Sequence, residues 1–165
     1  MPELILDCFV PDDAPVLCEA DHDPEHRRRF EFPDDFVPSL EHSRAVIARW
    51  AEERRAGVRF PFAVRDAATG TLLGGFELRP LGEGTANIAY WTYPPHRGRG
   101  VATEAVRQAC ALAFAELGFR RIELKADLDN VASRRVALRN GFREVGVRNG
   151  QMLHVLEAGD AGAMT

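Results

Sequence analysis

The chain has 165 residues, of which 45% are hydrophobic and 28% charged, and its formal net charge is −4. This length suits one domain with its own hydrophobic core, and the composition is that of an ordinary globular protein. The weak negative charge disfavours broad binding to nucleic acid or to anionic membranes. No apolar run approaches the roughly 18 residues of a membrane-spanning helix, and no signal peptide is expected at the N-terminus.

The three cysteines, Cys8, Cys18 and Cys110, are odd in number and scattered along the chain. They form neither a disulfide framework nor a metal-ligand spacing, and the histidines make no metal pattern with acidic residues. We therefore expect no metal, and a protein of the reducing cytoplasm.

The first half of the chain predicts a strand, a helix start, an irregular connection, a helix and a hairpin, at residues 3–9, 11–14, 21–38, 39–55 and 60–79. Ser39 or Ser43 can cap the helix. The connection at 21–38 contains three prolines and scattered phenylalanines, so we expect it to be only partly ordered.

The second half predicts a strand, a helix, a strand, a helix and a hairpin, at residues 86–93, 101–117, 121–128, 130–140 and 142–157. Asn149-Gly150 is a strong signal for the type I′ turn of that last hairpin. Residues 158–165 are expected to form a disordered tail after a single domain at residues 1–157.

The most informative feature is the glycine-rich run at residues 97–102, between a predicted strand and a predicted helix. Such a turn points several backbone N–H groups at one place, where the helix dipole adds positive charge, so it can bind a phosphate or pyrophosphate. The run lacks the Lys-Ser/Thr of a P-loop and the third glycine of the dinucleotide fingerprint. It matches Arg/Gln-x-x-Gly-x-Gly/Ala through Arg97, Gly100 and Ala102.

A second motif follows the next predicted strand, with Asn130 and Ser133 in an Asn-x-x-Ser pattern and Gly141-Phe142 further on. Together the two motifs resemble those of the GNAT superfamily of N-acetyltransferases, which bind acetyl-CoA. The resemblance covers roughly residues 86–147. It is strongest to the branch that acetylates the N-termini of ribosomal proteins and to related small-molecule acetyltransferases.

The resemblance implies an α/β fold whose central sheet is mixed, mostly antiparallel and flanked by helices. In the family this sheet splits between strands 4 and 5, and the cosubstrate enters the split. The predicted element order, β-α-α-β-β-β-α-β-α-β-β, agrees with this layout.

The resemblance also implies which residues bind acetyl-CoA. The loop and the start of its helix would hold the pyrophosphate through backbone N–H groups; they comprise Arg97, Gly98, Arg99, Gly100, Val101, Ala102 and Thr103. The strand before them, Tyr90, Trp91 and Thr92, would pair its backbone with the pantetheine arm, as an added strand does. Asn130 would contact the same arm, although it can equally cap the last helix.

Two residues are candidates for catalysis. The resemblance places Ser133 near the sulfur, where its hydroxyl could protonate the leaving thiolate. Ser133 would then adjust the rate without being essential, because a thiol of pKa ~8.5 needs little acid help to leave. Glu77, on the strand beside the pantetheine strand, would take the proton of the amine. His154 is a further candidate base. No tyrosine follows in the final helix, where the family often has one.

The resemblance predicts direct attack of a primary amine on acetyl-CoA in a ternary complex, with the thioester oxygen polarised by a backbone N–H of residues 90–92. The acceptor is a protein N-terminus or a small-molecule amine, and the protein is a monomer or homodimer. Another donor such as succinyl-CoA, or an acyl-CoA sensor without turnover, stays open. An acidic acceptor cleft would favour cationic small molecules; its candidates are Asp21, Asp23, Glu25, Asp34 and Asp35.

Overall fold

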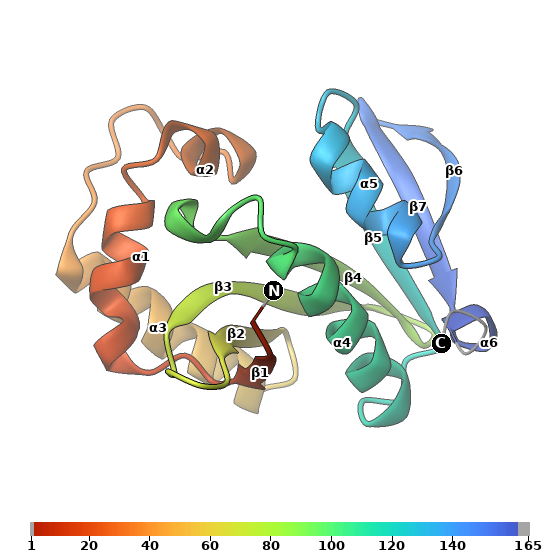
Figure 1. Cartoon of the computed structure of the whole chain (residues 1–165), viewed down its shortest axis with the longest axis horizontal. Helices are drawn as coiled ribbons and strands as arrows, with labels where there is room; N and C mark the ends of the chain where they lie inside the picture. Colours follow the sequence, from red (N-terminus) through yellow and green to blue (C-terminus); the bar gives the residue numbers. More distant parts are fainter. Residues whose placement is uncertain (1, 162–165) are drawn as a thin grey trace. The chain divides into compact units, whose positions relative to one another are not determined.

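The computed structural model describes residues 2–161. Within these residues, seven strands form one sheet in the order β1-β2-β3-β4-β5-β7-β6 (Figure 1). The strands are β1 (Leu4–Asp7), β2 (Phe60–Asp66), β3 (Leu72–Gly82), β4 (Thr85–Thr92), β5 (Arg121–Asp127), β6 (Arg143–Arg148) and β7 (Gln151–Glu157). The α-helices are α1 (Ala14–Ala20), α2 (Pro24–Arg29), α3 (Leu40–Arg55), α4 (Val101–Ala115), α5 (Val131–Arg139) and α6 (Ala158–Ala161), and short 3-10 turns occur at Pro11–Asp13 and Pro94–His96.

The chain divides into two compact units. The first contains the residues up to Gly75 together with Trp91–Val101, and the second contains Phe76–Tyr90 and the residues from Ala102 onward. The single domain expected at residues 1–157 remains a prediction. None of the helices within residues 2–161 has the length and apolar character needed to cross a membrane.

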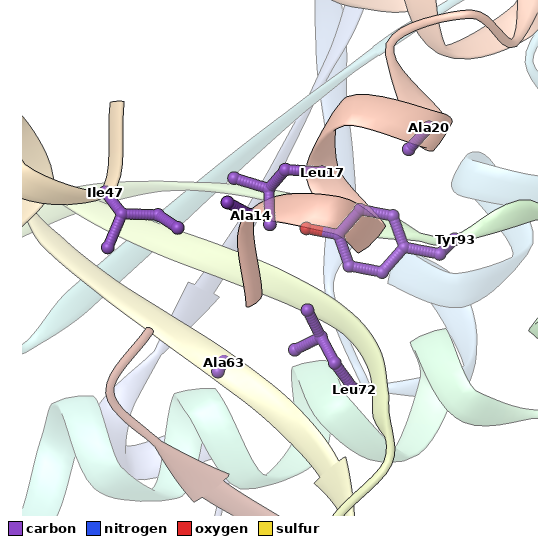
Figure 2. Close-up of a cluster of buried hydrophobic side chains, with 7 residues drawn as sticks. All are labelled: Ala14, Leu17, Ala20, Ile47, Ala63, Leu72 and Tyr93. Carbon is purple, nitrogen blue, oxygen red and sulfur yellow. The ribbon is translucent and has the colours of Figure 1, made fainter. Parts of the chain in front are cut away.

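The core of the first unit is a cluster of small and aliphatic side chains around one tyrosine ring (Figure 2). Its buried members are Ala14, Leu17, Ala20, Ile47, Ala63, Leu72 and Tyr93. Figure 2 shows these side chains pointing toward one another from α1, α3, β2, β3 and the segment after β4. Spacings of three in α1 place its apolar residues on one side of the helix, which is the side that packs on the sheet.

A buried ion pair links β2 to the turn before α1. Arg65 donates from Nη2 to Asp13 Oδ2 at 2.7 Å and from Nη1 to Asp13 Oδ1 at 2.9 Å. Asp13 also accepts from the backbone N–H of Val10 at 2.8 Å. The hydrogen bonds to the Asp13 carboxylate raise the pKa of Arg65, so the guanidinium stays charged.

The segment expected to be irregular, 21–38, contains a helix that the sequence analysis missed. Asp23 caps α2, because its carboxylate accepts from the backbone N–H of His26 at 2.9 Å, and Pro24 occupies the first turn. Proline tolerates that position since its missing N–H would have no helical partner there. An aspartate followed by a proline and an acidic residue was the local signal, and the neighbouring prolines obscured it.

In the second unit β4 and β5 run parallel and pair only at their beginnings, Thr85–Asn87 with Arg121–Glu123. β5 is antiparallel to β7 along its whole length, and β7 pairs in turn with β6. The predicted mixed, mostly antiparallel sheet is therefore confirmed. Asn149 and Gly150 have φ values of 52° and 79°, the two positive values that a type I′ turn requires.

Helices cover this part of the sheet and extend to the C-terminal end of the described chain. α5 packs on β5 and β6 (Figure 1). The buried side of α4 includes Cys110, and burial raises the pKa of its thiol to about 12.

The prediction of a disordered tail from residue 158 is wrong for α6, where the N–H of Ala158 donates to the carbonyl of Arg120 at 2.9 Å. Residues 162–165 of the predicted tail lie outside the described residues.

Candidate functional site

The glycine-rich loop has the backbone conformation that an anion site needs. Gly98 and Gly100 have φ values of 73° and 79°, in the left-handed region that favours glycine. α4 begins directly afterwards at Val101 and continues for 15 residues. The first N–H groups of such a helix have no partner within it, so they can donate to an anion.

The two arginines of the loop differ in their surroundings. Arg97 donates from Nε to the carbonyl of Thr92 at 3.2 Å and from Nη2 to Asp23 at 3.0 Å. The guanidinium therefore has a carboxylate partner within the first unit. Arg99 is exposed, with Nη1 3.5 Å from a ring nitrogen of His96. Of the two expected rim charges, Arg97 pairs with a carboxylate, and Arg99 makes no such ion pair within residues 2–161.

The contact with Arg97 also lowers the pKa of the Asp23 carboxyl. Burial raises the pKa of its carboxyl, but the N–H of His26 and the guanidinium of Arg97 outweigh that and hold the pKa below its usual value. Arg97 thus joins the cap of α2 to the end of β4. Its observed contacts are those of a residue that orders the loop.

The strand end predicted to carry the pantetheine arm lies close to β3. The carbonyl oxygen of Trp91 would be 2.3 Å from a Cβ at Gly74, and the Trp91 ring would be 2.6 Å from a Cβ at Gly75. Only glycine fits at these two positions. The indole lies near the rings of Phe9 and Trp50, at centroid distances of 6.3 and 5.8 Å, so the Trp91 side chain contributes to packing.

In the second unit, Asn130 and Ser133 lie at the start of α5. Asn130 is the N-cap, because its side-chain oxygen accepts from the N–H of Ser133 at 3.1 Å. The capping interpretation of Asn130 is confirmed. Its contact with a pantetheine arm stays a prediction.

Ser133 has a partner that the sequence analysis did not predict. Its hydroxyl oxygen lies 2.5 Å from the phenol oxygen of Tyr90, although 43 positions separate the two residues. Burial raises the pKa of Tyr90 to about 12, against the opposing effect of the Ser133 hydrogen bond. Only the backbone of Tyr90 was expected to take part in the site, and its side chain also lies next to Ser133.

The start of α4 and the end of α5 are also joined. Asn140, the C-cap of α5, donates from its side-chain amide to the carbonyl of Thr103 at 3.2 Å and to that of Val136 at 3.0 Å. Thr103 and Ala102 belong to the first turn of α4. Since α5 rises 1.5 Å per residue, Ser133 and Asn140 are on the order of 10 Å apart along its axis.

The two candidate bases differ in burial. Glu77 is half-buried on β3, between the fully buried Phe76 and Leu78, so it projects from the opposite face of the strand. His154 is completely buried, with Nδ1 3.1 Å from the carbonyl oxygen of Leu124 and Nε2 3.5 Å from Glu144. These contacts make His154 a core histidine.

Several of the carboxylates expected to form an acidic acceptor cleft are paired with nearby basic side chains. Glu25 bonds to Arg28 and Arg29, and Asp23 bonds to Arg97. Asp21 is buried, with His26 at 3.6 Å, and Asp34 and Asp35 are exposed. Among the described residues, no group of three or more His, Cys, Asp and Glu side chains can hold a metal ion.

Comparison with known proteins gives consistent results. The family model described as an acetyltransferase (GNAT) domain matches residues 3–143. A probable N-acetyltransferase of Bacillus subtilis, YjcK, is 32% identical over 117 residues, which are 69% of this chain and 64% of that protein. The chain thus spans slightly less than two thirds of this relative. The ribosomal-protein-serine acetyltransferase of Escherichia coli is 42% identical over 66 residues, 39% of this chain and 36% of that protein.

Solved structures share the fold. A probable acetyltransferase superposes with a TM-score of 0.79 at 26% identity, covering 94% of this chain and 93% of that one. Mycobacterium smegmatis RimJ, solved in complex with CoA-disulfide, gives a TM-score of 0.79 at 21% identity, covering 94% of this chain and 82% of that one.

Proposed function

Because the chain belongs to the GNAT acetyltransferase family, we propose that it transfers the acetyl group of acetyl-CoA to a primary amine. The observation that carries this proposal is the pair of left-handed glycines, Gly98 and Gly100, directly before a 15-residue helix. That backbone suits a pyrophosphate, and RimJ, which shares the fold, was solved with a CoA species.

In this proposal each segment holds one part of acetyl-CoA. The N–H groups at the start of α4, from Gly100 to Thr103, bind the pyrophosphate, with Arg99 adding charge at the rim. The backbone of residues 90–92 pairs with the pantetheine arm, which agrees with the early end of the β4–β5 pairing after Asn87. The hydrogen bond between Asn140 and Thr103 supports this arrangement, because it holds the first turn of α4 against the end of α5, and Ser133 is on the order of 10 Å from Asn140 along that helix.

The chemistry is direct transfer. A neutral amine attacks the thioester carbonyl carbon, the C–S bond breaks, and the sulfur takes a proton from the Ser133 hydroxyl. Much of the acceleration comes from holding the two reactants together. Glu77 is the proposed base for the amine, supported by its half-buried position opposite Phe76 and Leu78. An α-amine of pKa ~7.7–8 needs little help from it at neutral pH.

A peptide N-terminus is the acceptor that the structure favours over a polycation. The carboxylates of Asp23 and Glu25 are paired with arginines, which leaves less net negative charge to attract a polyamine. The similarity to the ribosomal-protein-serine acetyltransferase points the same way. We therefore propose a protein N-terminal α-amine as the substrate class.

Thermal unfolding with acetyl-CoA, CoA and succinyl-CoA tests the binding part. A ligand at 100 times its Kd adds about 2.7 kcal/mol to the free energy of unfolding, so the melting temperature should rise clearly. A rise with no CoA release in the presence of amines would support the sensor alternative. No rise with any CoA species would overturn the assignment of the loop.

A thiol-release assay tests the acceptor. Three acceptors suffice: a peptide with a free N-terminal serine, the same peptide blocked at its N-terminus but containing lysine, and spermidine. We expect CoA release with the first only. Faster release with spermidine would show that the acceptor is a small cation.

A further inference from the structure

Tyr90 and Ser133 form a hydrogen bond between two distant parts of the second unit. Tyr90 lies on β4 beyond the last β5 partner, Asn87, and alternation places it on the same face as the buried Ala86 and Ile88. Ser133 lies in the first turn of α5, one turn before the buried Ala137. The two hydroxyl oxygens are 2.5 Å apart.

Either hydroxyl can be the donor in this bond, and the partners around the phenol allow one arrangement that is useful for catalysis. The Tyr90 phenol has one proton, and two oxygens of Ser133 are within reach, Oγ at 2.5 Å and the carbonyl at 3.4 Å. Since burial raises the pKa of the phenol to about 12, the phenol keeps its proton at neutral pH and can donate it to the nearer oxygen. In that arrangement the Ser133 hydroxyl accepts from Tyr90 and can donate its own proton elsewhere.

The hydrogen bond from the Tyr90 phenol polarises the Ser133 hydroxyl, which is the second donor in the chain. A hydroxyl that accepts a hydrogen bond becomes a stronger donor itself, and its rotation is restricted because one lone pair is engaged. The N–H of Ser133 is held by Asn130 at 3.1 Å, which fixes the backbone below the side chain. Both effects are useful only where the Ser133 proton must go to one particular atom.

We propose that Tyr90 is a positioning residue, whose phenol donates to Ser133 Oγ and thereby directs the Ser133 proton to the sulfur of the departing CoA. This inference rests on the proposed function, in which Ser133 supplies that proton. The electron pair of the broken C–S bond goes to sulfur, which takes the Ser133 proton. The proton that the amine loses on forming the N–C bond goes to Glu77, the proposed base, and returns through solvent to the Ser133 oxygen, so the transfer is balanced.

A tether of β4 to α5 would be the alternative explanation of the same bond. A tether changes the stability of the protein and leaves kcat of the folded fraction unchanged. A positioning residue lowers kcat and leaves the KM for acetyl-CoA unchanged, because the missing hydroxyl acts only when the thiolate leaves.

A double-mutant cycle with Tyr90→Phe and Ser133→Ala separates the two explanations. Phenylalanine keeps the ring and removes only the phenol oxygen. We expect Tyr90→Phe to lower kcat about tenfold, the loss that corresponds to one hydrogen bond, with KM for acetyl-CoA within twofold. The double variant should be no slower than Ser133→Ala alone. Tyr93→Phe is the matched control, because it removes the phenol of a tyrosine buried in the core of the first unit.

Assays are made below the unfolding transition of every variant, and Ser133→Thr serves as a second test because it keeps a hydroxyl. Its activity should fall about tenfold when Tyr90→Phe is added. Tyr90→Phe with unchanged kcat, or effects that multiply in the double variant, would overturn the inference while Ser133→Ala still confirms the role of Ser133. Wild-type protein that neither binds acetyl-CoA nor releases CoA would instead overturn the proposed function, and this inference with it.

Discussion

At the scale of single residues, Gly100 is important both for the backbone conformation of the loop and for the proposed binding of the pyrophosphate. Its φ of 79° disfavours any residue with a Cβ, and it precedes the first N–H groups of α4. The first property concerns the stability of the loop and the second concerns the ligand. Two substitutions at the same position distinguish them.

Gly100→Glu should abolish binding of CoA, because it adds bulk and negative charge where the pyrophosphate is proposed to lie. Gly100→Ala is the control, since it has the same backbone strain without the charge; the strain costs roughly 1–2 kcal/mol. Thermal unfolding with and without CoA measures both effects. CoA should stabilise the alanine variant and leave the glutamate variant unchanged, and equal stabilisation of both would refute the pyrophosphate assignment.

At the scale of elements, α2 depends on one aspartate. The helix has only six residues, and Asp23 both caps it and pairs with Arg97. A helix this short is not stable by itself, so the cap and the ion pair contribute to its presence. Arg97 connects it to the proposed CoA-binding loop, which makes α2 relevant to the site.

Asp23→Ala should lower the free energy of unfolding by about 1 kcal/mol, the usual contribution of an N-cap. Asp23→Asn should lower it by less, because asparagine caps as well and only the partly exposed ion pair is lost. Urea denaturation measures both, with Asp35→Ala, an exposed position in the same segment, as the control. Equal losses for alanine and asparagine would assign the stabilisation to the ion pair.

At the scale of the whole molecule, the buried carboxyl of Asp21 makes stability depend on pH. Burial raises the pKa of Asp21 from 3.8 to about 6, and the cations His42, Arg27 and His22 oppose this only in part. The native protein therefore binds a proton more tightly than the unfolded chain does. Stability from this group is present below pH 4 and is lost as the pH rises through about 6.

Asp21→Asn should accordingly stabilise the protein at neutral pH and have no comparable effect below pH 4. The expected gain is at most about 3 kcal/mol, since one pKa unit corresponds to about 1.4 kcal/mol. Urea denaturation at pH 4 and pH 7.5 measures it, with the exposed Asp34→Asn as the control. A variant that is less stable than wild type at pH 7.5 would show that the charged carboxylate is stabilising.

Features that depend on short-range interactions along the chain were predicted correctly from the sequence. Caps and turns act over three or four residues, so the start of α3 at Ser39, the cap at Asn130 and the turn at Asn149-Gly150 agree with prediction. Periodicity predicted the strands and the long helices for the same reason. α2 was missed although its signal was local, because Pro24 and the two later prolines of the segment were interpreted as loop residues.

The amino-acid sequence by itself therefore determined the strands and the long helices, the phosphate-type loop and the family resemblance, all of which depend on neighbouring residues. Only the tertiary structure decided which distant side chains meet. It placed the Tyr90 phenol on Ser133, paired Arg97 with Asp23, and buried His154 in the core. These contacts depend on how helices and strands pack, and packing is a property of the whole fold that no local pattern of residues encodes.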